Sequence, residues 1–369
     1  MMLRTASIKL VYTQEDALLL KLLRQEYIAA CNFIVPEVIK NRCWNRFSLH
    51  KLVYNQLRSF SKLGSQMVCN AIFSVCRAYK AQKELGKIKK DDPVPNIAFN
   101  KGSIHFDKKT YTLTKSGELS LYTLEGRIKV TFQLGNHQKK LLENGTPKEA
   151  ELIFRNGNWY FNLVLEYPDA IKKENGIVIG IDVGENNIAA TSLGKIYGGK
   201  KLRDTRDRYL AQRRRLQSNG TQSAKQLLCK VSGRETRHVE HVNHEISKEI
   251  VEDAKKAGAS IIVLENLTNI RDNIRAKKRV RSRLHRWPFR QLQEFIAYKA
   301  KAAGIVVCYV NPAYTSVTCS KCLSIGKRIK HKFKCSNCGL LAHADCNSGR
   351  NLARIVESAD STRAKCKLA

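Results

Sequence analysis

The sequence predicts three kinds of architecture in one chain: an all-α part, an all-β part and a mixed α/β part. Apolar residues recur at helical spacing from residue 17 to about residue 84, and from about residue 103 to 167 they recur with a period of two. Two continuous apolar runs, IVIGIDV at 177–183 and ASIIVL at 259–264, are typical of central strands that are covered on both faces. At 369 residues the chain is long enough for two or three domains.

The composition is strongly basic. The formal net charge is +34, whereas the hydrophobic content of 43% is ordinary, so most of the chain is expected to fold. A chain that repels itself this strongly normally binds a polyanion, and without a long apolar segment nucleic acid is favoured over a membrane. The first residues, MMLRTASIKLVYT, alternate like a strand and contain no signal-peptide pattern, so we expect the protein in a reducing cytosol.

The N-terminal part is predicted to be one strand followed by a helical bundle. The strand covers residues 3–12, and Thr13-x-x-Asp16 then resembles a capping box that opens a helix. The apolar spacing beyond it predicts three or four helices. A solvated surface would explain basic residues on one such helix, but the charge of the whole chain favours nucleic-acid contact. The basic residues on the polar faces are Lys21, Arg24, Arg42, Arg46, Lys51, Arg58, Lys62, Arg77 and Lys80.

Short alternating strands follow a charged linker at 87–95. Several strands at this spacing predict a small barrel, which the opening strand joins, so that the helical bundle is inserted between its two parts. Trp159, Tyr160 and Phe161 can stack on bases, although core packing is the commoner role of aromatic residues in a strand. The predicted strands cover 103–106, 110–114, 119–122, 129–134 and a hairpin at 152–155 and 158–167, with a type I′ turn at Asn156-Gly157.

Three acids stand at the ends of elements in the C-terminal half. Asp182 and Glu265 each end a buried strand, and Asp345 begins a helical run at 347–356. One such acid would be read as a helix cap or a turn residue. Three in a basic protein imply bound cations, because carboxylates that are brought together unpaired repel one another. Mg²⁺ prefers carboxylate oxygens, and two such ions about 4 Å apart can promote hydrolysis of a phosphodiester.

Other elements connect these acids. We expect a return strand at 188–192, a basic helical region at 200–256, an amphipathic helix at 287–303 and a third buried strand at 305–310. His238, His241 and His244 are expected to make polar or RNA contacts, since positions six apart on a helix do not share a face. A basic segment at 271–290 would neutralise nucleic-acid backbone or form a disordered loop, and both remain open. Its cations include Lys277, Lys278, Arg279, Arg281, Arg283 and Arg286.

Four cysteines precede Asp345 as two Cys-x-x-Cys pairs. Cys319/Cys322 and Cys335/Cys338 have twelve residues between the pairs, a spacing that predicts a tetrahedral Zn²⁺ site. The basic residues at 321 and 327–334 would help to hold the cysteines as thiolates. A disulfide interpretation is not favoured, because nothing in the sequence indicates secretion.

The segments around the acids and the cysteines resemble a known family. GIDVGENNIAATSLG, VLENLTNI and HADCNSGRNLA resemble the three RuvC motifs of the RNase-H-like fold, interrupted by a zinc ribbon with TSVTCSKC and CSNC. The resemblance covers nearly the whole chain. It is to the TnpB family, the transposon-encoded RNA-guided DNA endonucleases that are related to type V CRISPR effectors. The resemblance implies that Asp182, Glu265 and Asp345 are the catalytic acids and bind Mg²⁺, or Mn²⁺ in its place. It also implies that the four cysteines hold structural zinc.

The same resemblance implies a domain plan and partners. An N-terminal wedge-type β-barrel (1–12 and 88–170) would contain an inserted helical recognition domain (13–87). A RuvC-like nuclease domain (171–314 and 339–357) would contain the Cys₄ zinc ribbon (315–338) and be followed by a basic tail (358–369). The implied partners are a guide RNA from the transposon end and double-stranded target DNA with a short adjacent motif. We expect a monomer in the prokaryotic cytosol or nucleoid.

One position departs from the family pattern. Small alanines usually follow the asparagine of the third motif, whereas here Ser348 and Gly349 follow Asn347. Glycine lowers helix propensity by about 1 kcal/mol relative to alanine, so a looser helix start is expected. Three alternatives remain: a DNA transposase or resolvase that acts without RNA, an RNA-guided DNA-binding regulator without nuclease activity, and a Holliday-junction resolvase. The basic bundle and the zinc ribbon do not favour the last.

Overall fold

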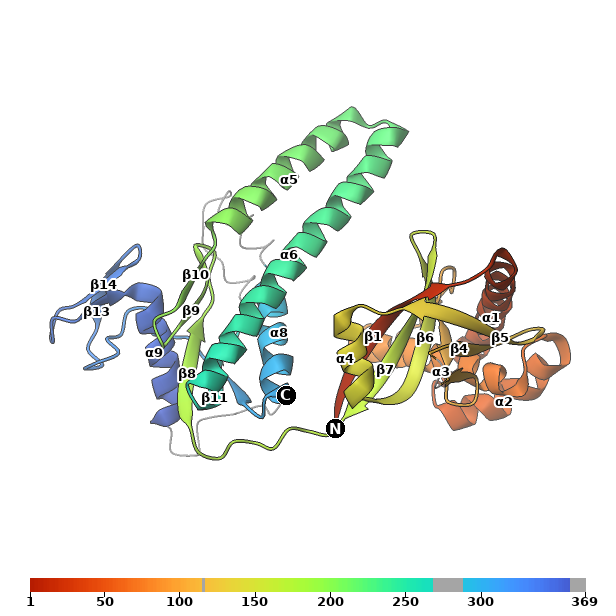
Figure 1. Cartoon of the computed structure of the whole chain (residues 1–369). Coiled ribbons are helices and arrows are strands. Elements are labelled where there is room, and N and C mark those ends of the chain that lie inside the picture. Colours follow the sequence, from red (N-terminus) through yellow and green to blue (C-terminus); the bar gives the residue numbers. More distant parts are fainter. Residues whose placement is uncertain (115–116, 268–287, 359–369) are drawn as a thin grey trace. The chain divides into compact units, whose positions relative to one another are not determined.

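A computed structural model describes residues 1–114, 117–267 and 288–358, and it divides into two compact units, Met1–Pro168 and Asp169–Ala369 (Figure 1). Each unit has a hydrophobic core of its own. Among the described helices, none is long and apolar enough to cross a membrane.

The first unit begins with a strand and three helices, as predicted. The strand β1 (Met2–Val11) leads into α1 (Gln14–Asn41), α2 (Arg46–Phe60) and α3 (Ser65–Glu84). The predicted capping box is confirmed: Thr13 Oγ1 accepts a hydrogen bond from Asp16 N at 3.1 Å, and Thr13 N donates to Asp16 Oδ2 at 2.9 Å. The helices bury most of the apolar residues at helical spacing, including Leu23, Leu49 and Val75, whereas Leu18 and Leu52 are exposed.

A seven-stranded sheet completes this unit, in the order β2-β6-β7-β1-β5-β4-β3. The opening strand β1 lies between β7 and β5, so the prediction that it joins the later strands is confirmed. The two edge strands follow one another in the chain with only residues 107–110 between them, so the sheet curls into a near-barrel. The remaining strands are β2 (Ile104–Phe106), β3 (Tyr111–Leu113), β4 (Leu119–Thr123), β5 (Gly126–Gln133), β6 (Thr146–Arg155) and β7 (Asn158–Tyr167).

Aromatic rings fill the interior of the curled sheet. The ring of Phe161 lies 5.9 Å from that of Phe106 and 5.3 Å from that of Tyr111. Trp159 and Phe161 are 3% and 0% exposed, so both belong to the core and are not free to stack on bases. Between β6 and β7, Asn156 and Gly157 have φ angles of 51° and 76°, which confirms the type I′ turn. Helix α4 (Asn136–Asn144) was not predicted.

The second unit contains the predicted mixed α/β sheet, in the order β10-β9-β8-β11-β12. Strand β11 pairs in parallel with β8 on one side and with β12 on the other, whereas β9 runs antiparallel to β8. The two continuous apolar runs are therefore adjacent inner strands, as expected from their sequences. The strands are β8 (Ile177–Asp182), β9 (Asn187–Thr191), β10 (Ile196–Gly198), β11 (Ala259–Glu265) and β12 (Val306–Val310).

Helices cover both faces of this sheet. Ile262 and Leu264 of β11 pack in one core with α6 (Gln222–Lys256) and α8 (Phe289–Ala302). Val263, which points to the opposite face, packs with Leu352 of α9 (Ala344–Glu357). The helix α9 contacts β8, β9 and β11, and Figure 1 shows it on the side of the sheet away from α6.

The region 200–256 differs from the prediction of one helical stretch. It forms two helices, α5 (Lys200–Asn219) and α6, which run as a long hairpin (Figure 1). Gly220 ends α5 with a φ of +67°, and Thr221 Oγ1 begins α6 by accepting a hydrogen bond from Ala224 N at 3.2 Å. The buried Glu235 of α6 forms ion pairs with Arg206 and Arg213 of α5, which fixes how the two helices pair.

A small three-stranded sheet, in the order β13-β14-β15, lies beside the paired cysteines, of which Cys335 ends β14. Its strands are β13 (Gly326–Ile329), β14 (Lys332–Cys335) and β15 (Leu341–His343). The sheet therefore extends past the predicted limit of residue 338 and ends directly before α9. We call residues 315–343 the ribbon.

Two glycines allow α9 to lie directly on β8. A Cβ atom on Gly180 would come within 1.9 Å of Gly349 O and 2.7 Å of Ala353 N. A Cβ atom on Gly349 would meet Gly180 O and Ser192 N at 3.1 Å. The glycine that departs from the family pattern is therefore part of a close backbone contact, and the helix begins at Ala344 as a regular element.

We expect the substitution Gly180→Ala to destabilise the protein, by about 3 kcal/mol or more, because its Cβ would overlap helix backbone that cannot move aside. The matched substitution Gly349→Ala should change stability by less than about 1 kcal/mol, since a gain in helix propensity offsets a shift of a few tenths of an ångström. Urea unfolding of the two variants measures the difference. Equal losses would contradict the close contact described here.

Candidate functional site

Two of the predicted acids lie side by side because their strands are adjacent and parallel. Asp182 is the last residue of β8 and Glu265 is the last residue of β11. In the register of the two strands Ile181 pairs with Leu264, so the acids are the next residues on neighbouring strands. The two carboxyl groups lie close enough for each to shift the pKa of the other. The sheet therefore brings together two side chains that are more than eighty residues apart in sequence.

The third acid reaches the same place from α9. Asp345 lies in the first turn of that helix and is 8% exposed. Its negative charge acts on both other acids, and it raises the pKa of Asp182 and of Glu265. The structure thus places all three predicted acids within electrostatic reach of one another.

Burial raises the pKa of both strand-end acids. For Asp182, desolvation is the largest cause, followed by the charge and the hydrogen bond of Glu265, and together they raise its pKa to about 9. For Glu265, desolvation again raises the pKa, while the hydrogen bond from Asp182 and the charge of Arg328 lower it. Acids held in this way keep a proton until a cation neutralises them, so the donors suit a divalent ion with a preference for oxygen ligands.

Asp345 has two partners that the sequence did not reveal. Arg328 Nη2 donates to Asp345 Oδ1 at 2.6 Å, and Asn187 Nδ2 donates to Asp345 Oδ2 at 2.7 Å. Arg328 belongs to β13 of the ribbon, and its charge also lowers the pKa of Asp182 and Glu265. In the sequence this arginine is one of several bases between the cysteine pairs, and no local pattern distinguishes it.

Glu265 is also held through its backbone. The amide of Gln293 on α8, which is 4% exposed, donates to Glu265 O at 2.9 Å. The next residue, Asn266, donates its backbone N–H to Val310 O at 2.7 Å. The end of β11 is thus fixed by a helix and by the neighbouring strand β12.

The four cysteines of the ribbon meet at one point. All four Sγ atoms lie within 4.8 Å of one another, and Cys319–Cys338 and Cys322–Cys335 are 3.6 Å and 3.5 Å apart. Tetrahedral zinc with Zn–S bonds of about 2.3 Å places sulfur atoms about 3.8 Å apart. The backbone N–H groups of Lys321 and Cys338 point at the sulfurs of Cys319 and Cys335. This donor set fits zinc.

Polar side chains of α9 bind the backbone of the ribbon. Asn347 accepts from Ser320 N at 3.0 Å and donates to Thr318 O at 2.7 Å. Asn351 donates to Thr315 O at 2.8 Å and to Thr318 O at 2.7 Å. The helix that carries Asp345 therefore also holds the first cysteine knuckle.

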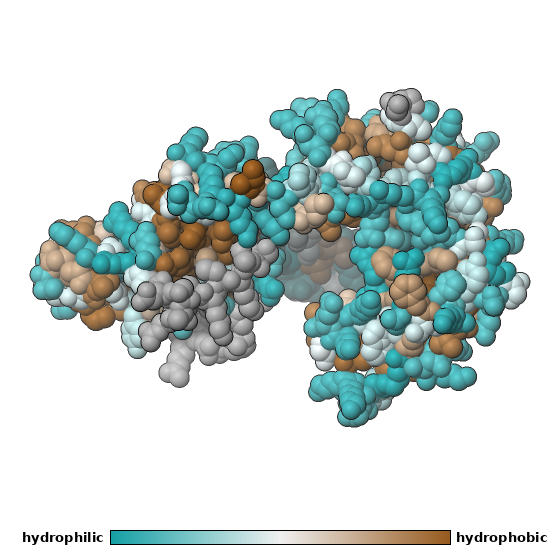
Figure 2. All heavy atoms as spheres, turned by 90° about the horizontal axis from the view of Figure 1, so that it is seen from below, coloured by the Kyte–Doolittle hydropathy of each residue, from teal (hydrophilic) through white to brown (hydrophobic). Residues whose placement is uncertain are grey.

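The other predicted contact residues lie elsewhere or outside the described residues. His241 is 3.4 Å from Glu245, His244 stacks on Phe295 at 3.9 Å, and His238 lines a pocket with Lys201 and Arg208. The basic residues predicted at 277–286 lie outside the described residues. On the face drawn in Figure 2, hydrophilic residues cover most of the surface, as expected for a charge of +34.

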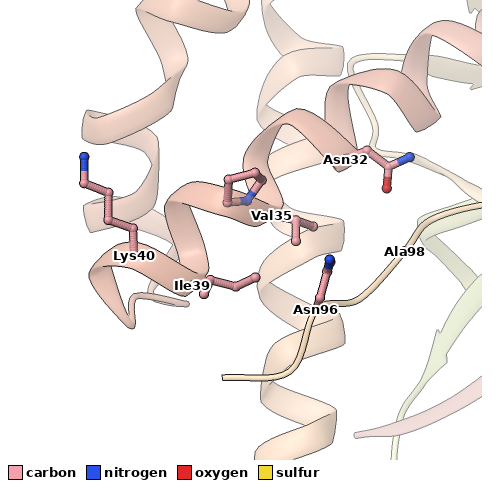
Figure 3. A pocket seen from close by; sticks show the side chains of 7 residues that line it. Asn32, Val35, Ile39, Lys40, Asn96 and Ala98 are labelled. Carbon is pink, nitrogen blue, oxygen red and sulfur yellow. The ribbon is translucent and has the colours of Figure 1, made fainter. Parts of the chain in front are cut away.

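The first unit contains a pocket of a different kind between α1 and residues 96–98 (Figure 3). Asn32 holds this segment by donating to Phe99 O at 3.0 Å and accepting from Phe99 N at 2.9 Å. The lining has neither acids nor thiols, so the pocket offers no metal chemistry. Its lining residues are Asn32, Val35, Pro36, Ile39, Lys40, Asn96 and Ala98.

The raised pKa of Asp182 has a consequence for stability. The folded protein keeps a proton that the unfolded chain releases near pH 4, so in the absence of divalent ions this acid destabilises the fold increasingly as the pH rises from about 4 toward 9. The variant Asp182→Asn should therefore melt at a higher temperature than the parent in Mg²⁺-free buffer. We expect a gain of at least about 2 °C at pH 8.5 and almost none at pH 4.5.

Thermal melts between pH 4.5 and 8.5 measure this difference. The control is Glu357→Gln, which removes one exposed carboxylate at the end of α9. A gain in Asp182→Asn that does not depend on pH, or that the control reproduces, would contradict the shifted pKa.

Comparisons with known families agree with this arrangement. The family model described as "Cas12f1-like, TNB domain" matches residues 289–352, and the one described as "Probable transposase" matches residues 162–271. Among solved structures, a cryo-EM structure of a Cas12f1–sgRNA–target DNA complex shares the fold, with a TM-score of 0.69 and 18% identity over 93% of this chain and 83% of that one.

Curated relatives are closer in sequence. A Cas12f1 endodeoxyribonuclease of Sulfoacidibacillus thermotolerans is 46% identical over 115 residues, which is 30% of this chain but only 26% of that protein. A TnpB-like protein of Methanocaldococcus jannaschii is 32% identical over 255 residues, which covers 64% of this chain and 89% of that protein. The chain belongs to the TnpB-like family.

Proposed function

We propose that this protein is an RNA-guided DNA endonuclease that hydrolyses the DNA backbone with divalent metal ions at Asp182, Glu265 and Asp345. The observation that carries the proposal is the mutual electrostatic influence of three carboxyl groups in a chain of charge +34. Acids collected in one place and desolvated are unfavourable by themselves and imply a cation. The names of the relatives support the same activity.

The fold of the second unit supports a RuvC-like assignment. Its strand order, with β9 antiparallel among otherwise parallel central strands, suits an RNase-H-like domain, which we propose at 171–314 and 344–357. We likewise propose that the near-barrel of the first unit is a wedge-type barrel (1–12 and 88–170), with the helices at 13–87 as a recognition domain. The ribbon (315–343), as the proposed zinc ribbon, and a proposed basic tail (358–369) complete the plan.

In the proposed mechanism the protein positions ions and substrate. Two Mg²⁺ ions would activate a water and stabilise the leaving oxygen. Asp182 and Glu265 would hold them from the ends of adjacent strands, and Asp345 would join from α9. Asp182 and Glu265 would have to lose their protons to hold the ions, because burial raises the pKa of both acids. Mn²⁺ can replace Mg²⁺ at such oxygen ligands.

The proposed partners are a guide RNA and double-stranded target DNA. The Cas12f1 structure with the similar fold contains an sgRNA and target DNA. In such a system base pairing selects the target, while the protein binds the heteroduplex by shape and charge and reads a short adjacent motif. The basic faces of α1 to α3 and of α5 are the candidate RNA and DNA contacts, and we propose a cytosolic monomer.

Substitution of one acid should separate cleavage from binding. We expect Asp182→Ala, Glu265→Ala and Asp345→Ala each to lower guide-dependent cleavage by at least about 10³-fold, while guide-dependent DNA binding changes less than threefold. RNA that co-purifies with the protein is sequenced first, and a guide built on it directs cleavage of a plasmid in Mg²⁺. The control is Asp253→Ala, an acid of α6 that pairs with Lys195.

The alternatives predict different outcomes. A transposase would be favoured if no discrete RNA co-purifies and the protein joins or cuts DNA ends. The match to the family model described as "Probable transposase" is consistent with this alternative. RNA-guided binding without cleavage by the unaltered protein would favour a regulator. Unchanged cleavage in all three acid variants would refute the proposed active site.

The proposed zinc should stabilise α9 as well as the ribbon. The variant Cys335→Ser should lose zinc, and hydrogen exchange should then rise both at 315–321 and in α9, because Asn347 and Asn351 bind the ribbon backbone. Mass spectrometry measures both the zinc content and the exchange. The control is Cys229→Ser at an exposed thiol. Faster exchange confined to the ribbon would contradict the coupling to α9.

A further inference from the structure

A second set of metal-type ligands lies beside the three acids. The ligand atoms of His331, His343 and Asp345 all lie within 4.8 Å of one another. His331 occupies the turn between β13 and β14, and His343 ends β15 directly before α9. None of the proposed catalytic roles uses the two histidines.

The backbone of the ribbon holds the two imidazoles together. His343 pairs with Lys332 across β14 and β15, and Ala344 N donates to His331 O at 2.8 Å. The two rings are stacked, with centroids 5.5 Å apart and an angle of 20° between their planes. The pairing of the strands therefore sets the distance between the two imidazole rings.

One ring nitrogen of this pair has no partner. Nδ1 of His343 is buried and has no hydrogen-bond partner among the described residues. Burial of a polar atom without a partner is unfavourable. Asp345 already accepts bonds from Arg328 and Asn187, but a carboxylate has about four lone-pair sites and can bind an ion as well.

We propose that His331, His343 and Asp345 bind one transition-metal ion, with at least one coordination position left open. Two imidazoles and a carboxylate suit Zn²⁺ and Mn²⁺, whereas Mg²⁺ prefers oxygen ligands only. The ion would share Asp345 with the acid site, and it would link the ribbon to the start of α9. The positive charge of Arg328 beside Asp345 opposes this binding and sets its strength.

Zinc binding by the purified full chain tests this proposal without any assay of cleavage. Protein whose Cys₄ site already holds one equivalent is titrated with Zn²⁺ by calorimetry in Mg²⁺-free buffer, and metal content is checked by mass spectrometry. We expect a second equivalent. His331→Ala and His343→Ala should each weaken it at least tenfold, and the double variant should abolish it. Arg328→Gln should bind the ion more tightly than the parent.

Three control variants identify the ligands. His241→Ala removes an exposed imidazole on α6 and should leave the second equivalent unchanged. Asp182→Asn and Glu265→Gln should also retain it. Loss in these two acid variants with retention in the histidine variants would assign the ion to the proposed active site and overturn the inference.

The outcome stays decisive if one variant misfolds. Retention of the Cys₄ zinc shows that a variant is folded, and if His343→Ala fails this criterion, His331→Ala decides, because its side chain lies in an exposed turn. A parent protein that binds no second equivalent, or a double histidine variant that binds it as well as the parent, refutes the site. Neither result bears on DNA cleavage, so the proposed nuclease stands or falls separately.

Discussion

The parallel pairing of β8 with β11 is the constraint on which the candidate site depends. It places Asp182 and Glu265 at the same edge of the sheet, where burial raises the pKa of both acids. Two desolvated acids at this position do not stabilise the sheet by themselves. Perturbed acids of this kind, in a chain of net charge +34, are typical of a site that binds a cation.

The contact between α9 and β8 extends this constraint to the ribbon. Gly180 and Gly349 let the helix backbone approach the strand closely, and the charge of Asp345 in the first turn of this helix acts on the two strand-end acids. The same helix binds the ribbon backbone through Asn347 and Asn351. A displacement of the ribbon would therefore act on the third acid through a rigid helix, and no flexible linker lies between them.

Much of this arrangement could be predicted from the sequence because it depends on local patterns. The two apolar runs, the acids that end them, the Asn156-Gly157 turn and the cysteine spacing each predict structure within a few residues. The division of residues 200–256 was missed because the helical pattern continues on both sides of Gly220. Arg328 and His343 were missed for another reason. Their partners depend on how the ribbon packs against α9, and no local sequence pattern indicates this packing.

The third acid differs from the other two in the cations that surround it. Burial raises the pKa of Asp182 and of Glu265, whereas Asp345 forms an ion pair with Arg328 and lies beside two imidazoles. A guanidinium bound to one carboxylate oxygen weakens the attraction of that carboxylate for a second cation. A metal ion at Asp345 would therefore compete with Arg328. Arg328 is carried by the ribbon, so the charge beside Asp345 depends on where the ribbon lies against α9.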